Sequence, residues 1–172
     1  AIAVTGSDIS DEQRADIEAA INGESAIISH MSAVQETHDV YSESGNMEGY
    51  ILALDDVSAI DDYVMLRNRK SGEHLFLEEG KVIITEKMAR MLDVKTGDSI
   101  TIDGASGPVE ISGIAENYTF HYVYMTRDTY TSLFGDTDDD LIMINTGDTP
   151  DREERDRITA ELISCDGIIS SS

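Results

Sequence analysis

Two neighbouring stretches decide how the middle of this chain is built: KVIITEKMARMLDVKTGDSITI at residues 81–102 and VEISGIAENYTFHYVYMTRDTYTSLFG at residues 109–135. In the first stretch an apolar run ends at Thr85, a residue type that favours the start of a helix. Met88 and Leu92 follow at helical spacing. The segment SITIDG is then rich in β-formers, and VEISGIAENY alternates apolar and polar residues. The sequence therefore predicts a strand, a short helix and a series of strands in this region.

Four residues in these stretches are predicted to shape the backbone. Gly97 permits a tight turn that a side chain would hinder, and Asp98 can hydrogen-bond the backbone two residues further on. Gly113 allows a bend or a close approach inside a strand. Gly135 ends the short helix predicted over residues 128–134 by adopting the left-handed conformation. We expect all four to act in folding and not in ligand binding.

The two ends of the chain alternate helices and strands. An N-cap at Ser10 predicts a helix over residues 10–22, and apolar alternation predicts strands within residues 25–41 and 49–56. The further predicted elements are a helical turn in 56–64, two short strands in 67–85 separated by turns at 70–72 and 79–80, a strand at 121–125, a strand at 141–145, a helix from Pro150 to about Ser164, and a strand in 167–171. This order predicts an α+β fold with two lobes: residues 1–55 with 140–172 form an outer lobe of strands packed by helices, and residues 56–139 form a β-rich middle lobe.

The charge of the chain is strongly negative. It has 12 Lys and Arg against 35 Asp and Glu, a formal net charge of −23, while 40% of its residues are hydrophobic. Such a chain can bury a core, but it repels nucleic acids and anionic lipid surfaces. The acidity either attracts a cationic partner or only keeps the protein soluble, and we favour the second interpretation. No stretch approaches the roughly 20 apolar residues of a membrane span, so the sequence predicts a fragment that is soluble in isolation.

No motif in the chain indicates a metal site, a cofactor site or catalysis. The four His residues form no HExxH pattern, and the single cysteine, Cys165, excludes a cysteine-based zinc site. The acidic loop at residues 136–140 begins like a calcium loop, but Leu141 stands where a glycine is required and Gly147 where a glutamate is required. We therefore predict no catalytic residues, no metal and no cofactor.

Aromatic residues gather between residues 118 and 134. On a strand, Phe120, Tyr122 and Tyr124 would share one face, with Tyr118 just before them. One interpretation, which we favour, is that they form a wall of a small core. The other is that Tyr118, Phe120, Tyr122 and Tyr124 form a contact surface for a peptide or a partner protein, because aromatic side chains are enriched in binding hot spots.

The two quoted stretches together resemble the extracytoplasmic domain of FtsX-like ABC transporter permeases, the family that includes MacB. The resemblance covers residues 56–136 and rests on Ile84-Thr85, the helix around Met88–Leu92, the Gly97-Asp98 turn, the step from Ile111 to Ile114, and Leu133-Phe134-Gly135. The segment that contains ENY and HYVYM is especially similar to the large outer loops of the long permeases of Gram-positive bacteria. The exceptional acidity of the chain departs from the usual pattern of the family.

The resemblance implies a non-enzymatic, MacB-like outer domain on the cell surface, inserted between transmembrane helices of a permease that works with a cytoplasmic ATPase. Such a domain binds or senses a substrate, a peptide or a cell-envelope protein and couples that contact to ATP-driven motion of the helices. Nucleic acid is not an expected partner. A second hypothesis is a free-standing, soluble, acidic binding protein with a β-barrel core, and a remote third is a hydrolase with an unrecognised carboxylate pair.

Overall fold

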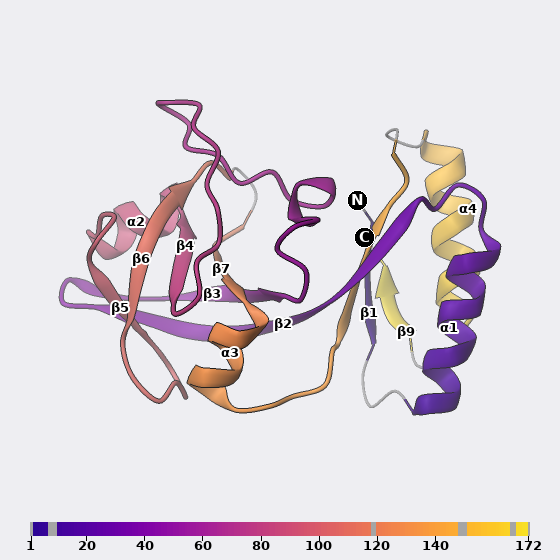
Figure 1. The fold of residues 1–172 in the computed structure, drawn as a ribbon, viewed down its shortest axis with the longest axis horizontal. Helices are drawn as coiled ribbons and strands as arrows, with labels where there is room; N and C mark the ends of the chain where they lie inside the picture. The colour runs from indigo at the N-terminus through magenta and orange to yellow at the C-terminus, as the bar shows by residue number, and fades with distance from the viewer. Residues whose placement is uncertain (1, 7–9, 118–119, 148–150, 166–167, 172) are drawn as a thin grey trace. The chain divides into compact units, whose positions relative to one another are not determined.

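The computed structural model describes residues 2–6, 10–117, 120–147, 151–165 and 168–171. Within these ranges the chain forms an α+β fold, shown in Figure 1. Its elements in chain order are β1 (Ile2–Gly6), α1 (Asp11–Gly23), β2 (Ser29–Ser42), β3 (Gly45–Leu54), the single turn η1 (Ile60–Asp62), β4 (Lys81–Thr85), α2 (Glu86–Leu92), β5 (Ser99–Ile102), β6 (Val109–Ala115), β7 (Tyr122–Thr126), α3 (Arg127–Phe134), β8 (Leu141–Asn145), α4 (Arg152–Ile163) and β9 (Ile168–Ser171).

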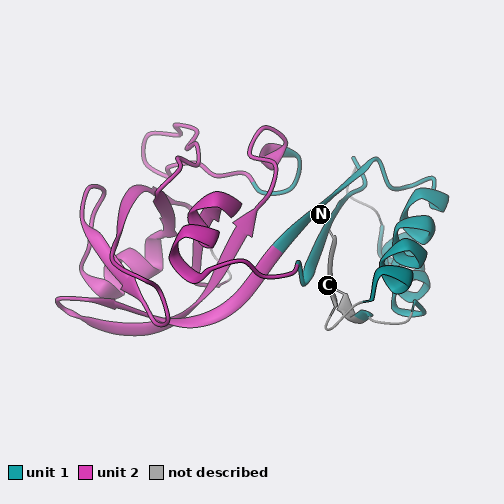
Figure 2. Cartoon of the chain, turned by 60° about the horizontal axis from the view of Figure 1, so that its bottom comes forward, with its two compact units in different colours: residues 1–33, 62–64, 139–172 teal, residues 34–61, 65–138 magenta. Residues whose placement is uncertain are grey.

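The chain divides into two compact units, coloured separately in Figure 2. Unit 1 comprises residues 1–33, 62–64 and 139–172, and unit 2 comprises residues 34–61 and 65–138. The sequence predicts that residues 34–55 belong with the chain ends, whereas in this division they belong to unit 2. The reason is that residues 50–54 of β3 pair with β7 and Val40 and Tyr41 of β2 pair with β5, while β2 and β3 also pair with each other.

In unit 2 six strands form a closed ring of pairings. The order β3-β7-β4-β6-β5-β2 is completed by a further pairing between β3 and β2, so each of the six strands has two neighbours. The β3–β7 and β4–β6 pairs are parallel, while β4–β7, β5–β6 and β2–β5 are antiparallel. Closure of the ring removes the exposed strand edges that an open sheet would present to other chains.

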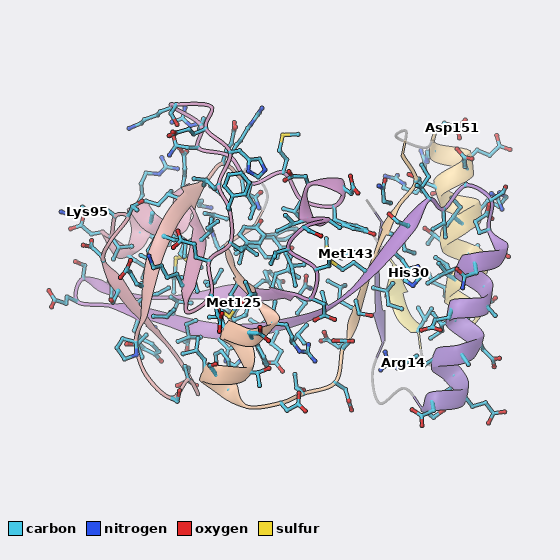
Figure 3. All side chains as sticks on the ribbon, viewed as in Figure 1. Arg14, His30, Lys95, Met125, Met143 and Asp151 are labelled. Carbon is cyan, nitrogen blue, oxygen red and sulfur yellow. The ribbon has the colours of Figure 1, made fainter. Side chains whose placement is uncertain are left out.

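The interior of the ring is a single apolar core. Every strand contributes alternate residues to it, as the period of two along a strand requires, and Met125 of β7 is among the fully buried ones (Figure 3). The helix α2 packs against β3 and β4, and α3 packs against β3 and β7. The buried core residues are Val34, Val40, Met47, Ile51, Ala53, Val82, Ile84, Met88, Ala89, Leu92, Ile100, Ile102, Val109, Ile111, Val123, Met125 and Tyr130.

Unit 1 has its own sheet and its own core. The first part of β2 pairs with β8, β8 with β1, and β1 with β9, all antiparallel. Figure 1 shows α1 and α4 side by side on one face of this sheet. The helices bury Ile17 and Ile21 of α1 against Ile158 and Leu162 of α4, together with Ile144 of β8. The four-residue spacing within each helix gives the apolar stripe that this packing needs.

Several predicted elements are confirmed, and some predictions are wrong. The helix at residues 10–22 is α1, and Ser10 caps it in a capping box with Gln13. The strand β1 was not predicted. Of the two short strands expected within residues 67–85, β4 is one, and the segment before it contains only an isolated bridge between Arg67 and His74. The start of the last helix at Pro150 lies outside the described residues. Among those described, α4 begins at Arg152 with Asp151 as its N-cap.

One ion pair joins the two helices of unit 1. The Arg157 guanidinium on α4 lies 2.6 Å from the carboxylate of Glu24, the residue that caps the C-terminus of α1. This hydrogen bond, helped by the backbone amide of Ala26, lowers the pKa of Glu24 from 4.5 to about 2. Because the folded state holds this pKa below its unfolded value, the carboxylate stabilises the fold above pH 4.5, and that contribution is lost as the pH falls toward 2.

We expect Arg157→Met to lower the free energy of unfolding at neutral pH, because Glu24 loses its partner. The difference from the wild type should shrink as the pH approaches about 2, where Glu24 becomes protonated in both proteins. Urea unfolding at a series of pH values measures this. Arg152→Met is the matched control, since Arg152 is 89% exposed and its one ion pair with a described residue is to Asp156 of its own helix, at 3.7 Å. If the difference in unfolding free energy between Arg157→Met and the wild type does not change with pH, the ion pair with Arg157 is not what lowers the pKa of Glu24.

Candidate functional site

A group of aromatic residues of unit 2 lies on and beside one face of the parallel strands β3 and β7. Tyr50 pairs in register with Tyr122, and Leu52 pairs with Tyr124. The residues between them, such as Val123, point the opposite way, into the apolar core of the six-stranded closed barrel of unit 2. The pairing therefore stacks side chains from two distant stretches of the sequence on a single face.

Four rings on this face form a contiguous group, which we call the aromatic cluster: Tyr50, Phe120, Tyr122 and Tyr124. The rings of Tyr122 and Tyr124 are stacked with centroids 5.3 Å apart, and Tyr50 lies 5.5 Å from Tyr122. Phe120 meets Tyr50 edge-on at 5.7 Å and Tyr122 at 6.3 Å. These are the offset and edge-to-face arrangements that aromatic pairs prefer, so the rings hold one another in place.

The cluster runs from the interior of the unit to its surface. Tyr124 is 4% exposed and its hydroxyl accepts a hydrogen bond from Asn117 Nδ2 at 3.1 Å, whereas Phe120 is 51% exposed. Burial raises the pKa of Tyr124 to about 12, and burial also raises the pKa of the half-buried Tyr122. Tyr124 is thus a packed, buried residue. Phe120 exposes an apolar ring to solvent and lies against the rings of Tyr50 and Tyr122.

The structure places the four predicted aromatic residues differently from one another. Tyr122 and Tyr124 share a face of β7, as the alternation predicts. Phe120 precedes that strand, although it contacts the same rings, and Tyr118 lies outside the described residues. Sequence reasoning missed Tyr50, whose position in the run GYILAL gives it the same alternation but whose pairing with β7 joins residues far apart in the sequence.

The predicted turn residues occupy special backbone positions. Gly97 has a φ of 92°, a conformation that residues with a side chain rarely adopt, and a Cβ there would meet nothing within 4 Å. Its amide donates to the carbonyl of Ile111, which ties the turn to β6. The Asp98 carboxylate accepts from the amide of Lys95, three residues earlier, and not from the residue two positions later as predicted.

The other two glycines act on strand and helix geometry. Gly113 lies opposite Ile83 just after a shift in the β4–β6 register, and a Cβ on it would approach the side chain of Leu75 to 3.2 Å. Gly113 therefore allows both the irregular pairing and the close approach of Leu75. Gly135 follows α3 with a φ of 93° and a ψ of −178°. The positive φ agrees with the prediction, but the ψ differs from that of a left-handed helical cap.

Two properties of the described residues bear on the class of site. Within the ranges that the structure describes, no group of three or more His, Cys, Asp or Glu side chains could hold a metal ion. No helix in the same ranges has both the length and the apolarity required to cross a membrane.

Comparison with known proteins decides the family. The family model described as the MacB-like periplasmic core domain matches residues 2–162. The chain belongs to the family of MacB-like periplasmic core domains. The match includes both quoted stretches and extends beyond them into both ends of the chain, where the sequence alone carries no recognisable motif.

Solved structures agree with the fold of this family. The periplasmic region of MacB from Actinobacillus actinomycetemcomitans has a TM-score of 0.56 at 10% identity, with 99% of this chain and 86% of that chain covered. The extracellular domain of the noncanonic ABC-type transporter YknZ from Gram-positive bacteria has a TM-score of 0.54 at 16% identity, with 100% and 98% covered. No curated protein sequence matches the chain. The family and these structures indicate an extracytoplasmic domain of an ABC-type transporter permease.

The graded burial of the aromatic cluster predicts unequal effects of truncation. Tyr124→Ala should lower the free energy of unfolding by about 3 kcal/mol, because it empties a buried site. Phe120→Ala should lower it by less than about 1 kcal/mol, because half of that ring is already in water. Urea unfolding of the two variants makes the comparison. Equal losses would show that Phe120 is a core residue and would remove it as a contact residue.

Proposed function

We propose that this MacB-like domain is non-enzymatic and acts outside the cell by binding or sensing a substrate or partner and coupling that contact to ATP-driven motion of the membrane helices of its permease. A cytoplasmic ATPase would supply the motion. The family assignment supports the setting, and the exposed end of the aromatic cluster supports a contact surface on unit 2.

The connections between the units support a mechanical role. In a permease of this kind the domain is inserted between membrane helices. The first and last described strands, β1 and β9, are neighbours in the sheet of unit 1. Both membrane connections would therefore enter unit 1. The chain passes between the units at four places, after residues 33, 61, 64 and 138, and the first of these lies inside β2. A displacement of unit 1 would reach unit 2 along these connections.

The surface chemistry supports a partner with apolar and cationic groups. Phe120 offers an apolar ring that Tyr50 and Tyr122 hold in a fixed orientation, so little conformational entropy is lost when a partner covers it. The net charge of −23 would draw a cationic peptide or cell-envelope protein toward the domain. The single observation that carries this part of the proposal is the half-exposed ring of Phe120 on a base of packed aromatic side chains.

Spin labels on both units test the coupling in the complete permease reconstituted with its ATPase. We would replace Cys165 by serine and introduce Asp16→Cys on α1 of unit 1 and Lys95→Cys after α2 of unit 2, both at exposed positions. Pulsed electron paramagnetic resonance then measures the distance between the labels without nucleotide and with trapped ATP. The proposal predicts that the distance distribution shifts when ATP is trapped, because the units move relative to each other.

A second pair of labels, Glu48→Cys and Lys95→Cys, lies entirely within unit 2 and serves as the control. Its distance distribution should be the same in both nucleotide states, because the closed barrel moves as one body. If the pair across the two units also keeps one distribution in both states, the domain does not relay ATP-driven motion between its units and the coupling proposal is wrong.

A further inference from the structure

The positive charges of this acidic chain are concentrated around α2. Seven of the 12 Lys and Arg residues fall between residues 67 and 95, where only five Asp and Glu residues occur. This stretch therefore carries a net charge of +2, although the whole chain carries −23. Part of this stretch lines a hollow in the surface of unit 2. The lining of this hollow therefore carries more positive than negative side chains.

The hollow has a volume of about 300 Å³ and lies between α2 and the loop at Arg69 and Lys70. Its charged lining consists of Arg69, Lys70 and Arg90 against Glu86 and Asp93, a net charge of +1. The floor is apolar. Ala89 is a buried residue of the barrel core, and Val94 and Ile114 pack partly buried against that core. The hollow thus combines an apolar base with a cationic rim.

The ion pairs of the rim leave two cations for a ligand. Arg69 Nε donates to both carboxylate oxygens of Glu86, at 3.2 and 2.9 Å, so these two charges compensate each other. Among the described residues no ion pair involves Lys70, Arg90 or Asp93. Lys70 and Arg90 thus place two cationic side chains beside an apolar floor, an arrangement complementary to an anion that carries an apolar group.

We infer that this hollow binds a small organic anion with an apolar body, presented as the C-terminal residue of a peptide. The carboxylate would lie between Lys70 and Arg90, and the apolar side chain would cover Ala89, Val94 and Ile114. A terminal residue carries both groups on one Cα, which suits a site of this size. The inference goes beyond the proposed function, because it requires neither the membrane nor the ATPase.

The probe is N-acetyl-leucine, and its matched control is N-acetyl-leucinamide, which has the same apolar body without the carboxylate. A titration followed by ¹⁵N–¹H correlation spectra of the 172-residue chain reports which amides respond. We expect N-acetyl-leucine to shift the amides of Ala89, Val94 and Ile114 with a Kd of about 1 mM. The amide probe and acetate should each bind at least about 10-fold more weakly, because each lacks one half of the recognised group.

Two double variants of equal charge test the residues. Lys70→Gln with Arg90→Gln should weaken binding of N-acetyl-leucine by at least about 10-fold, and Arg152→Gln with Arg155→Gln, on α4 of unit 1, should leave it unchanged. All four side chains are exposed, and thermal unfolding checks that both variants fold. The inference is overturned if N-acetyl-leucine shifts no amide of the hollow up to about 20 mM, if acetate or the amide binds as tightly, or if both double variants lose binding equally.

Discussion

The pairing of β2 is the constraint on which the rest of the structure depends. Residues Val40 and Tyr41 pair with β5, and β2 also pairs with β3, which closes the six-stranded ring of unit 2. Residues 29–33 of the same strand pair with β8 in the sheet of unit 1. Without β2 the barrel would have two open edges and the sheet of unit 1 would lose its strand beside β8. One strand therefore completes two separate hydrogen-bonded structures.

The two units are held by different interactions. Unit 2 is a closed ring around a continuous apolar core, with the aromatic cluster and the cationic hollow on its surface. Unit 1 depends on two amphipathic helices that share a small core of isoleucine and leucine and an ion pair between Glu24 and Arg157.

Local signals in the sequence predicted much of this fold. Ser10 marked the start of α1, and Gly97 marked a turn that requires a positive φ. What the sequence did not predict depends on pairing between distant residues. The strand β1 is short and becomes a strand only between β8 and β9, and Tyr50 joins the aromatic cluster only because β3 lies beside β7. Lys70 and Arg90 are 20 residues apart in the sequence, and only the fold places both at one hollow.

The most direct test of the two-unit account is native-state hydrogen exchange along β2 after unit 1 has been destabilised. Ile158→Ala removes a fully buried side chain from the core of unit 1. The account predicts faster exchange for the β2 amides within residues 29–33 and unchanged exchange for Val40 and Tyr41, since these belong to different cooperative units. If all of these amides accelerate together by the same factor, the chain unfolds as one body and the account is contradicted.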